Sequence, residues 1–71
     1  MMKKGDVVMN KYAPLYETLG TNTGRPYYQG VNQTDALLTA KQSGFECTVL
    51  RDGSLFAVYS PISGMKYYQN A

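Results

Sequence analysis

The stretch FECTVLRDGSLFAVYS, residues 45–60, decides the fold, because two runs of β-favouring residues flank the dipeptide Asp52-Gly53. Asp-Gly between such runs is the strongest short signal for a two-residue type I′ hairpin turn, whose two central positions need positive φ. This turn sets the register of the hairpin. The expected pairs are Arg51–Ser54, Leu50–Leu55, Val49–Phe56, Thr48–Ala57, Cys47–Val58 and Glu46–Tyr59.

Side chains alternate between the two faces of a strand with a period of two. The pattern predicts a core face that carries Phe45, Cys47, Val49, Phe56 and Val58. The other face is predicted to carry Glu46, Thr48, Leu50, Leu55, Ala57 and Tyr59. A second turn, PISG at residues 61–64, would return the chain as a third strand, with Tyr67 on the core face and Lys66 and Tyr68 on the other.

A helix is predicted for NQTDALLTAKQSG, residues 32–44. Asn32 can cap its start, Asp35 lies in the first turn, and Gly44 supplies a left-handed stop. Its apolar stripe, formed by Ala36, Leu37 and Ala40, is narrow and small. The helix is therefore expected to pack closely on the core face of the sheet.

The first third of the chain is less clearly patterned. GRPYYQGV, residues 24–31, predicts a strand with Pro26 at its start, and either Tyr27 or Tyr28 is expected on the non-core face. Residues 12–19 allow a helix by the spacing of their apolar residues, but Pro14 and the tyrosines favour an edge strand. In that case TNTG, residues 21–24, closes a hairpin.

These elements follow one another as β-β-α-β-β-β, which predicts an α+β fold with one helix on a largely antiparallel sheet. The expected domain organisation is a leader over residues 1–11, which can be loose, and a single α+β domain over residues 12–71. A chain of 71 residues buries only roughly 60% of its unfolded surface, so its stability should be marginal. Formation of a dimer or binding of a partner would add to this stability.

The composition argues against most chemistry. With one cysteine and no histidine, we expect no internal disulfide, no metal site and no cofactor. Each of the five acidic residues has a structural place, so no catalytic pair is expected and we predict a protein that is not an enzyme. Without an apolar signal region or long apolar run, the chain is expected to be cytoplasmic.

The non-core face, with Tyr59, Tyr68 and Lys66, leaves three functions open. It can bind another protein, since tyrosine is enriched at interfaces. It can stack bases as in binders of single-stranded nucleic acid, although a net charge of only +2 counts against this. It can also close a homodimer.

GRPYYQGVNQTDALLTAKQSGF and TVLRDGSLFAVYSPISGMKYY, about two thirds of the chain, resemble the small phage anti-CRISPR proteins that target type I-F surveillance complexes. The matching residues are Gly24, Ala40, Lys41, Phe45, Thr48, Val49, Leu50, Arg51, Gly53, Leu55, Ala57, Tyr59, Gly64, Lys66 and Tyr67. The resemblance implies a non-enzymatic phage or mobile-element protein that inhibits a host defence complex in the host cytoplasm. It also implies that basic residues on the helix and last strand meet the target, and Lys41 and Lys66 match by position.

Taken together, the predicted partner is a host protein or ribonucleoprotein, such as a type I CRISPR surveillance complex. The expected contacts are Tyr59, Lys66, Tyr68 and Arg51 on the sheet and Lys41 on the helix. Aromatic and arginine side chains of this kind are common anchors of protein interfaces.

Overall fold

The computed structural model describes residues 13–68, and within them it contains five strands and one helix in the order β-β-α-β-β-β. The predicted leader, residues 1–11, lies outside the described residues, as does Tyr12. The elements are β1 (Tyr16–Gly20), β2 (Pro26–Gly30), α1 (Gln33–Ser43), β3 (Cys47–Arg51), β4 (Ser54–Ser60) and β5 (Gly64–Tyr67).

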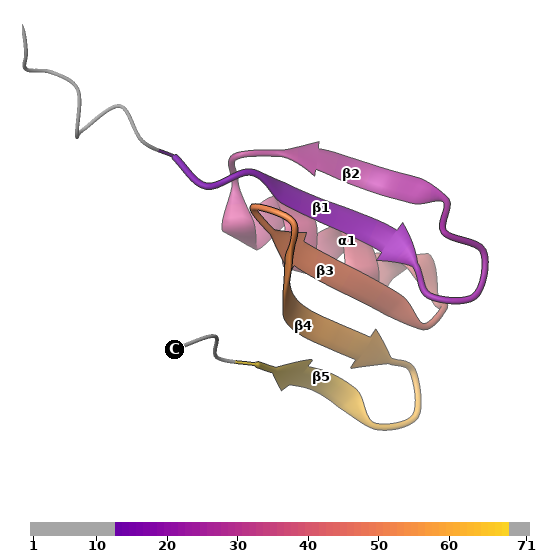
Figure 1. Cartoon of the computed structure of the whole chain (residues 1–71). Coiled ribbons are helices and arrows are strands. Elements are labelled where there is room, and N and C mark those ends of the chain that lie inside the picture. The colour runs from indigo at the N-terminus through magenta and orange to yellow at the C-terminus, as the bar shows by residue number, and fades with distance from the viewer. Residues whose placement is uncertain (1–12, 69–71) are drawn as a thin grey trace, which may run out of the picture.

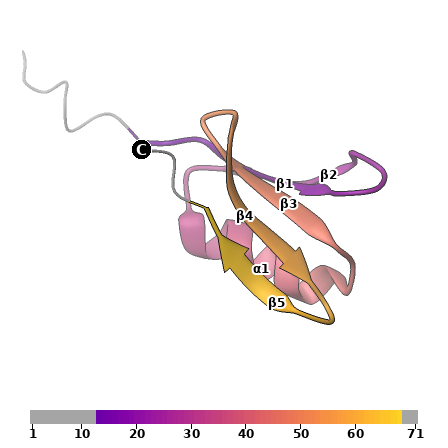
Figure 2. The same cartoon turned by 60° about the horizontal axis from the view of Figure 1, so that its bottom comes forward.

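The strands form one sheet in the order β2-β1-β3-β4-β5, and every neighbouring pair is antiparallel. Because β2 and β3 flank β1, they run in the same direction, and α1 provides the crossover between them. The helix packs on β1, β2 and β3 and lies on one side of the sheet only (Figures 1 and 2). The predicted two-layer α+β fold is confirmed. Below, the side covered by α1 is called the helix side and the opposite one the outer face.

The helix has the ends that its sequence predicts. The side-chain Oδ1 of Asn32 accepts a hydrogen bond of 3.0 Å from the backbone N–H of Asp35, which satisfies one of the free donors at the helix start. Gly44 ends the helix in the left-handed region, with a φ of 78°. Ala36 and Ala40 are fully buried against the sheet, so their small size sets the close approach of the two layers.

β1 confirms the strand that was favoured for residues 12–19 over the described part, but it is an internal strand, so its expected position at the edge of the sheet is wrong, as is the helix alternative. It pairs with β2 on one side and with β3 on the other. Pro14 precedes the strand and removes no ladder hydrogen bond from it. Tyr16 is buried on the helix side, and its hydroxyl donates to Oε1 of Gln33 at 2.9 Å, which ties β1 to the first turn of α1.

The central hairpin has the predicted turn but contains a β-bulge that the sequence analysis missed. Asp52 and Gly53 both have positive φ, 52° and 82°. Beyond the Leu50–Leu55 pair the register shifts by one residue, because β4 has one more residue than β3 at this point. The observed pairs are Val49–Ala57, Thr48–Val58 and Cys47–Tyr59, so the predicted pairs beyond Leu50–Leu55 are wrong.

Because of the bulge, the residues in the second half of β4 lie on the opposite side of the sheet from the one predicted. Ala57, predicted on the non-core face, is completely buried on the helix side. Tyr59 lies on the same side, opposite Cys47. Val58, predicted in the core, lies opposite Thr48 on the outer face. Phe56 remains on the helix side, where its ring packs edge-on against Tyr16 at a centroid distance of 5.6 Å.

Four further aromatic side chains test the predicted faces of the sheet. Phe45, predicted in the core, is 60% exposed, because it follows Gly44 at the end of the helix and precedes the first residue of β3. Tyr27 and Tyr28 both lie on the helix side, since the register of β1 and β2 also shifts, between Thr18 and Leu19. Tyr67 lies on the helix side as predicted, but it is 55% exposed and α1 does not extend over β5.

The buried core is small. It consists of Tyr16, Ala36, Ala40, Cys47, Val49 and Ala57, together with the buried polar residue Thr18. Three of the six buried apolar side chains are alanines. The interior therefore buries little apolar area for each residue, as expected for so short a chain.

Candidate binding site

The structure separates the five predicted contact residues. Only Lys66 and Tyr68 lie together: both belong to the outer face, and Nζ of Lys66 is 5.5 Å from the centroid of the Tyr68 ring. Tyr59 lies on the helix side, so its placement on the outer face is wrong. Arg51 is exposed at the end of β3, on the helix side and opposite Tyr16, and Lys41 is exposed in the last turn of α1.

The outer face of the sheet is left uncovered by the elements that the structure describes. Alternation along the paired strands places the following residues on it: Glu17, Leu19, Thr48, Leu50, Leu55, Val58, Lys66 and Tyr68. The helix lies on the opposite side, and no described element packs against this face (Figures 1 and 2). Four aliphatic side chains occupy its centre.

The polar groups of the outer face are paired with one another. Oε2 of Glu17 accepts a hydrogen bond of 3.2 Å from Nε2 of Gln29 on β2. The hydroxyls of Thr21 and Thr48 lie 2.8 Å apart and share a hydrogen bond. Lys66 is stacked over Tyr68 at the other edge. The face is therefore an aliphatic centre with one acidic and one basic edge, which suits contact with another protein.

Sequence reasoning missed Leu19 and Val58 as members of this surface. Leu19 shares a face with Glu17, and this signal was available once residues 16–20 were assigned to a strand. Val58 could not be placed, because the bulge in β4 reverses the alternation from which its position was inferred.

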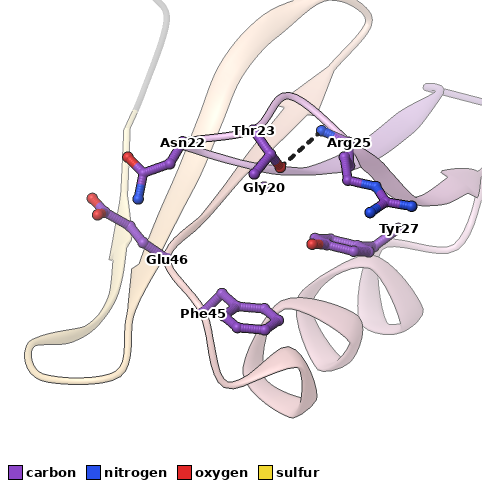
Figure 3. Close-up of a pocket in the computed structure, with 7 residues that line it drawn as sticks. All are labelled: Gly20, Asn22, Thr23, Arg25, Tyr27, Phe45 and Glu46. Atoms are coloured by element: carbon purple, nitrogen blue, oxygen red, sulfur yellow. Dashed lines mark hydrogen bonds between the residues drawn. The ribbon is translucent and has the colours of Figure 1, made fainter.

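A second surface feature is a hollow on the helix side, where the β1–β2 turn meets the loop between α1 and β3. Its lining residues are Gly20, Asn22, Thr23, Arg25, Tyr27, Phe45 and Glu46. In Figure 3 the rings of Tyr27 and Phe45 lie on opposite sides of the hollow. Arg25 lies on the Tyr27 side, and Asn22 and Glu46 lie at the other end.

The turn that forms one wall of this hollow is held by hydrogen bonds. Within the turn, Gly24 N–H donates to the carbonyl of Gly20 at 2.7 Å and Arg25 N–H to the hydroxyl of Thr23 at 3.2 Å. The N–H of Thr21 also donates to the carbonyl of Glu46 at 3.0 Å, which joins the turn to the start of β3. The two chain segments that meet at the hollow are therefore fixed relative to each other.

The chemistry available to the described residues is limited. Among residues 13–68, no three acidic, cysteine or histidine residues lie close enough together to hold a metal ion. Cys47 is completely buried, with its sulfur 3.2 Å from the hydroxyl of Ser43. Glu17 is engaged by Gln29, Asp35 lies in the first turn of α1, and Asp52 accepts from the N–H of Leu15 at 2.8 Å. The described part contains no helix long and apolar enough to cross a membrane.

Comparison of the chain with protein-family models, with curated proteins and with solved structures finds no match. We therefore infer the function of the chain from the surfaces described above.

Proposed function

We propose that this chain is a small non-enzymatic protein that acts by binding another protein through the outer face of its sheet. One observation carries the proposal: four aliphatic side chains (Leu19, Leu50, Leu55 and Val58) form the centre of a sheet face on which no described element packs. A monomer of this size seldom leaves such an area without a partner.

The edge of the outer face adds specificity to this contact. Lys66 and Tyr68 on the β5 side offer a cation and an aromatic ring, both of which are common in interface anchors. Glu17 lies on the β1 side. A complementary partner would therefore present an apolar centre with an acidic group near Lys66.

The finer proposal is that the partner is a host defence complex and that the protein acts in the host cytoplasm as an inhibitor. Its support is the resemblance to phage anti-CRISPR proteins of the type I-F class. Lys66, one of the two basic positions in that resemblance, lies on the outer face, whereas Lys41 lies on the opposite layer of the molecule. The proposed contact surface therefore retains Lys66 and leaves out Lys41, Arg51 and Tyr59.

The test is co-purification of the tagged chain from bacteria that carry an active type I CRISPR system, with identification of the bound proteins by mass spectrometry. The matched variants are Val58→Lys on the outer face and Ile62→Lys in the β4–β5 turn, where Ile62 is 95% exposed. Val58→Lys should abolish recovery of surveillance-complex subunits, and Ile62→Lys should leave it unchanged.

Two results would contradict the proposal. Equal recovery of the complex by both variants would remove the outer face from the interface. Recovery of the tagged chain with untagged copies of itself alone would indicate a homodimer, for which sedimentation should show twice the monomer mass in wild type and monomer mass in Val58→Lys.

A further inference from the structure

The sheet has two edges, β2 and β5, and they differ in how well they are protected against further pairing. β2 begins with Pro26, and its pairing with β1 shifts in register between Thr18 and Leu19. A proline and a bulge are both devices that prevent the pairing of another strand at a sheet edge. The four residues of β5 pair with β4 in a single register, and no described strand lies beyond them (Figure 1). β5 is therefore the more regular of the two edges.

The backbone of β5 presents hydrogen-bonding groups that no described strand binds. The N–H of Tyr68 donates to the carbonyl of Phe56 at 2.8 Å, so every second residue before it, Lys66 included, turns its backbone groups toward β4. By the same alternation, Met65 and Tyr67 turn their N–H and C=O groups away from the sheet. Such a row of donors and acceptors is a template for an additional strand.

The helix side of β5 also exposes apolar surface next to this edge. Phe56 packs edge-on against both Tyr16 and Tyr67, at centroid distances of 5.6 and 5.9 Å. Tyr67 is the last ring of this row and is 55% exposed, because α1 packs on β1, β2 and β3 and does not extend over β5. The row of rings therefore ends at the sheet edge on a surface that the described elements leave open.

We propose that β5 pairs antiparallel with β5 of a second copy of this chain, so that the sheet continues from five strands to ten. The register of such a pair is restricted by its two-fold symmetry. If Met65 lay opposite Tyr67 of the second copy, Lys66 would lie directly opposite Lys66, and like charges in this position are destabilising. A register centred on Met65 would continue into the turn at residues 61–63, which is not extended. A register centred on Tyr67 avoids both problems.

In the register centred on Tyr67, the two copies complement each other on both sides of the joined sheet. On the helix side, Tyr67 lies opposite Tyr67 of the second copy, and the two exposed rings cover each other. On the outer face, Lys66 lies opposite Tyr68 of the second copy, so a cation again meets a ring, as it does within one chain at 5.5 Å. A second copy supplies both matches by symmetry, which favours it over a strand of another protein.

The dimer does not rest on the proposed function, but it changes the surface that a partner would meet. The two-fold axis between directly opposed residues of an antiparallel pair is perpendicular to the sheet. Both helices therefore lie on one side of the joined sheet, and both outer faces lie on the other. The dimer presents two copies of the outer face side by side.

The first experiment is sedimentation equilibrium of the full chain at concentrations from about 10 µM to about 1 mM. We expect monomer mass at the low end and twice this mass at the high end, since a strand of four residues contributes few contacts. Amide hydrogen exchange locates the contact. The N–H of Tyr67 should exchange about fivefold more slowly at the high end, as the monomer fraction falls. The N–H of Gln29, which points outward on the β2 edge, should exchange equally at both concentrations.

Charged variants at Tyr67 test the register. Tyr67→Lys and Tyr67→Glu each place two like charges opposite each other, so each should raise the dissociation constant of the dimer about tenfold. An equal mixture of the two variants should recover most of this loss, because lysine then lies opposite glutamate. Tyr27→Lys and Tyr27→Glu, at the 40% exposed ring on β2, should associate like the wild type. Circular dichroism reports that each variant is folded.

Three results would overturn the proposal. The first is monomer mass at every concentration up to about 1 mM. The second is a dimer that Tyr67→Lys leaves intact and Val58→Lys dissociates, which would assign the contact to the outer face. The third is a mixture of Tyr67→Lys and Tyr67→Glu that associates no better than either variant alone, which would mean that Tyr67 does not lie opposite itself. Recovery or loss of a host complex in co-purification bears on none of these results, so this proposal and the proposed function fail separately.

Discussion

The hydroxyl of Thr18 donates a hydrogen bond of 2.8 Å to the backbone carbonyl of Ala36, and both residues are completely buried. This bond joins the centre of β1 directly to the helix. This bond is a buried polar contact between the sheet and the helix. No feature of the sequence predicted it.

Replacement of Thr18 by valine keeps the shape of the side chain and removes this bond. We expect the free energy of unfolding to fall by about 1 kcal/mol, the net value of a typical intramolecular hydrogen bond. Urea denaturation followed by circular dichroism measures it. Thr39→Val is the matched control, because the hydroxyl of Thr39 also donates to a helix carbonyl, that of Asp35, but at an exposed site. Equal losses in both variants would show that burial adds nothing to the Thr18 bond.

The bulge in β4 predicts opposite responses at neighbouring positions. Ala57→Lys should cost about 3 kcal/mol or more, because it forces a charge into the core. Val58→Lys should cost less than about 1 kcal/mol, because the outer face lets the ammonium reach water. The urea midpoints of the two variants show which substitution is more destabilising. If β4 alternated regularly without a bulge, Val58→Lys would be the more destabilising of the two.

Gly20 is predicted to be sensitive to the smallest side chain. Gly20→Ala should destabilise the fold by about 1–3 kcal/mol, because its Cβ would collide with Oγ1 of Thr23 and press on the Tyr27 ring. The double variant Gly20→Ala/Thr23→Ala should be more stable than the sum of the two single losses, since the nearest colliding atom is gone. If the losses of stability in the two single variants simply add in the double variant, the contact with Oγ1 of Thr23 is not the cause of the Gly20→Ala effect.

Cys47 provides a probe of unfolding. Its side chain is completely buried beside Ser43, so the native protein should not react with a thiol reagent such as DTNB. Reaction should appear in urea in parallel with the loss of circular dichroism, if the domain opens as one unit. Rapid labelling without denaturant would mean that the end of α1 separates from β3 by itself. The variant Ser54→Cys, at an exposed position next to the hairpin turn, supplies the fully reactive reference.

The element order and both ends of the helix were predictable from the sequence because they depend on local chemistry. Asp52-Gly53 requires a tight turn, and Asn32 and Gly44 have the side-chain and backbone properties of helix caps. The internal position of β1 was not predictable, since strand order depends on pairing between segments far apart in the chain. Leu15, for example, is bound through its N–H and its carbonyl to Asp52.

The candidate site could be predicted only in part. Lys66 and Tyr68 were placed together because β5 follows the PISG turn in regular alternation. Tyr59 was misplaced because a bulge leaves no clear mark in an apolar run such as LFAVY. The hollow was not predicted because its walls come from two separate loops, which meet through the hydrogen bond from the N–H of Thr21 to the carbonyl of Glu46.

The extra residue in β4 also limits how this chain can be aligned with others. A homologue of the same length that paired regularly throughout the hairpin, without a bulge at Phe56, would place every later side chain of its β4 on the opposite face. Two such proteins could share identical letters after this position and still present different surfaces. A homologue that lacked Phe56 would instead keep the faces seen here, because Ala57 and Val58 would still lie opposite Val49 and Thr48. Identical residues in an alignment without a gap at this position therefore show a shared binding surface only if the bulge is shared too.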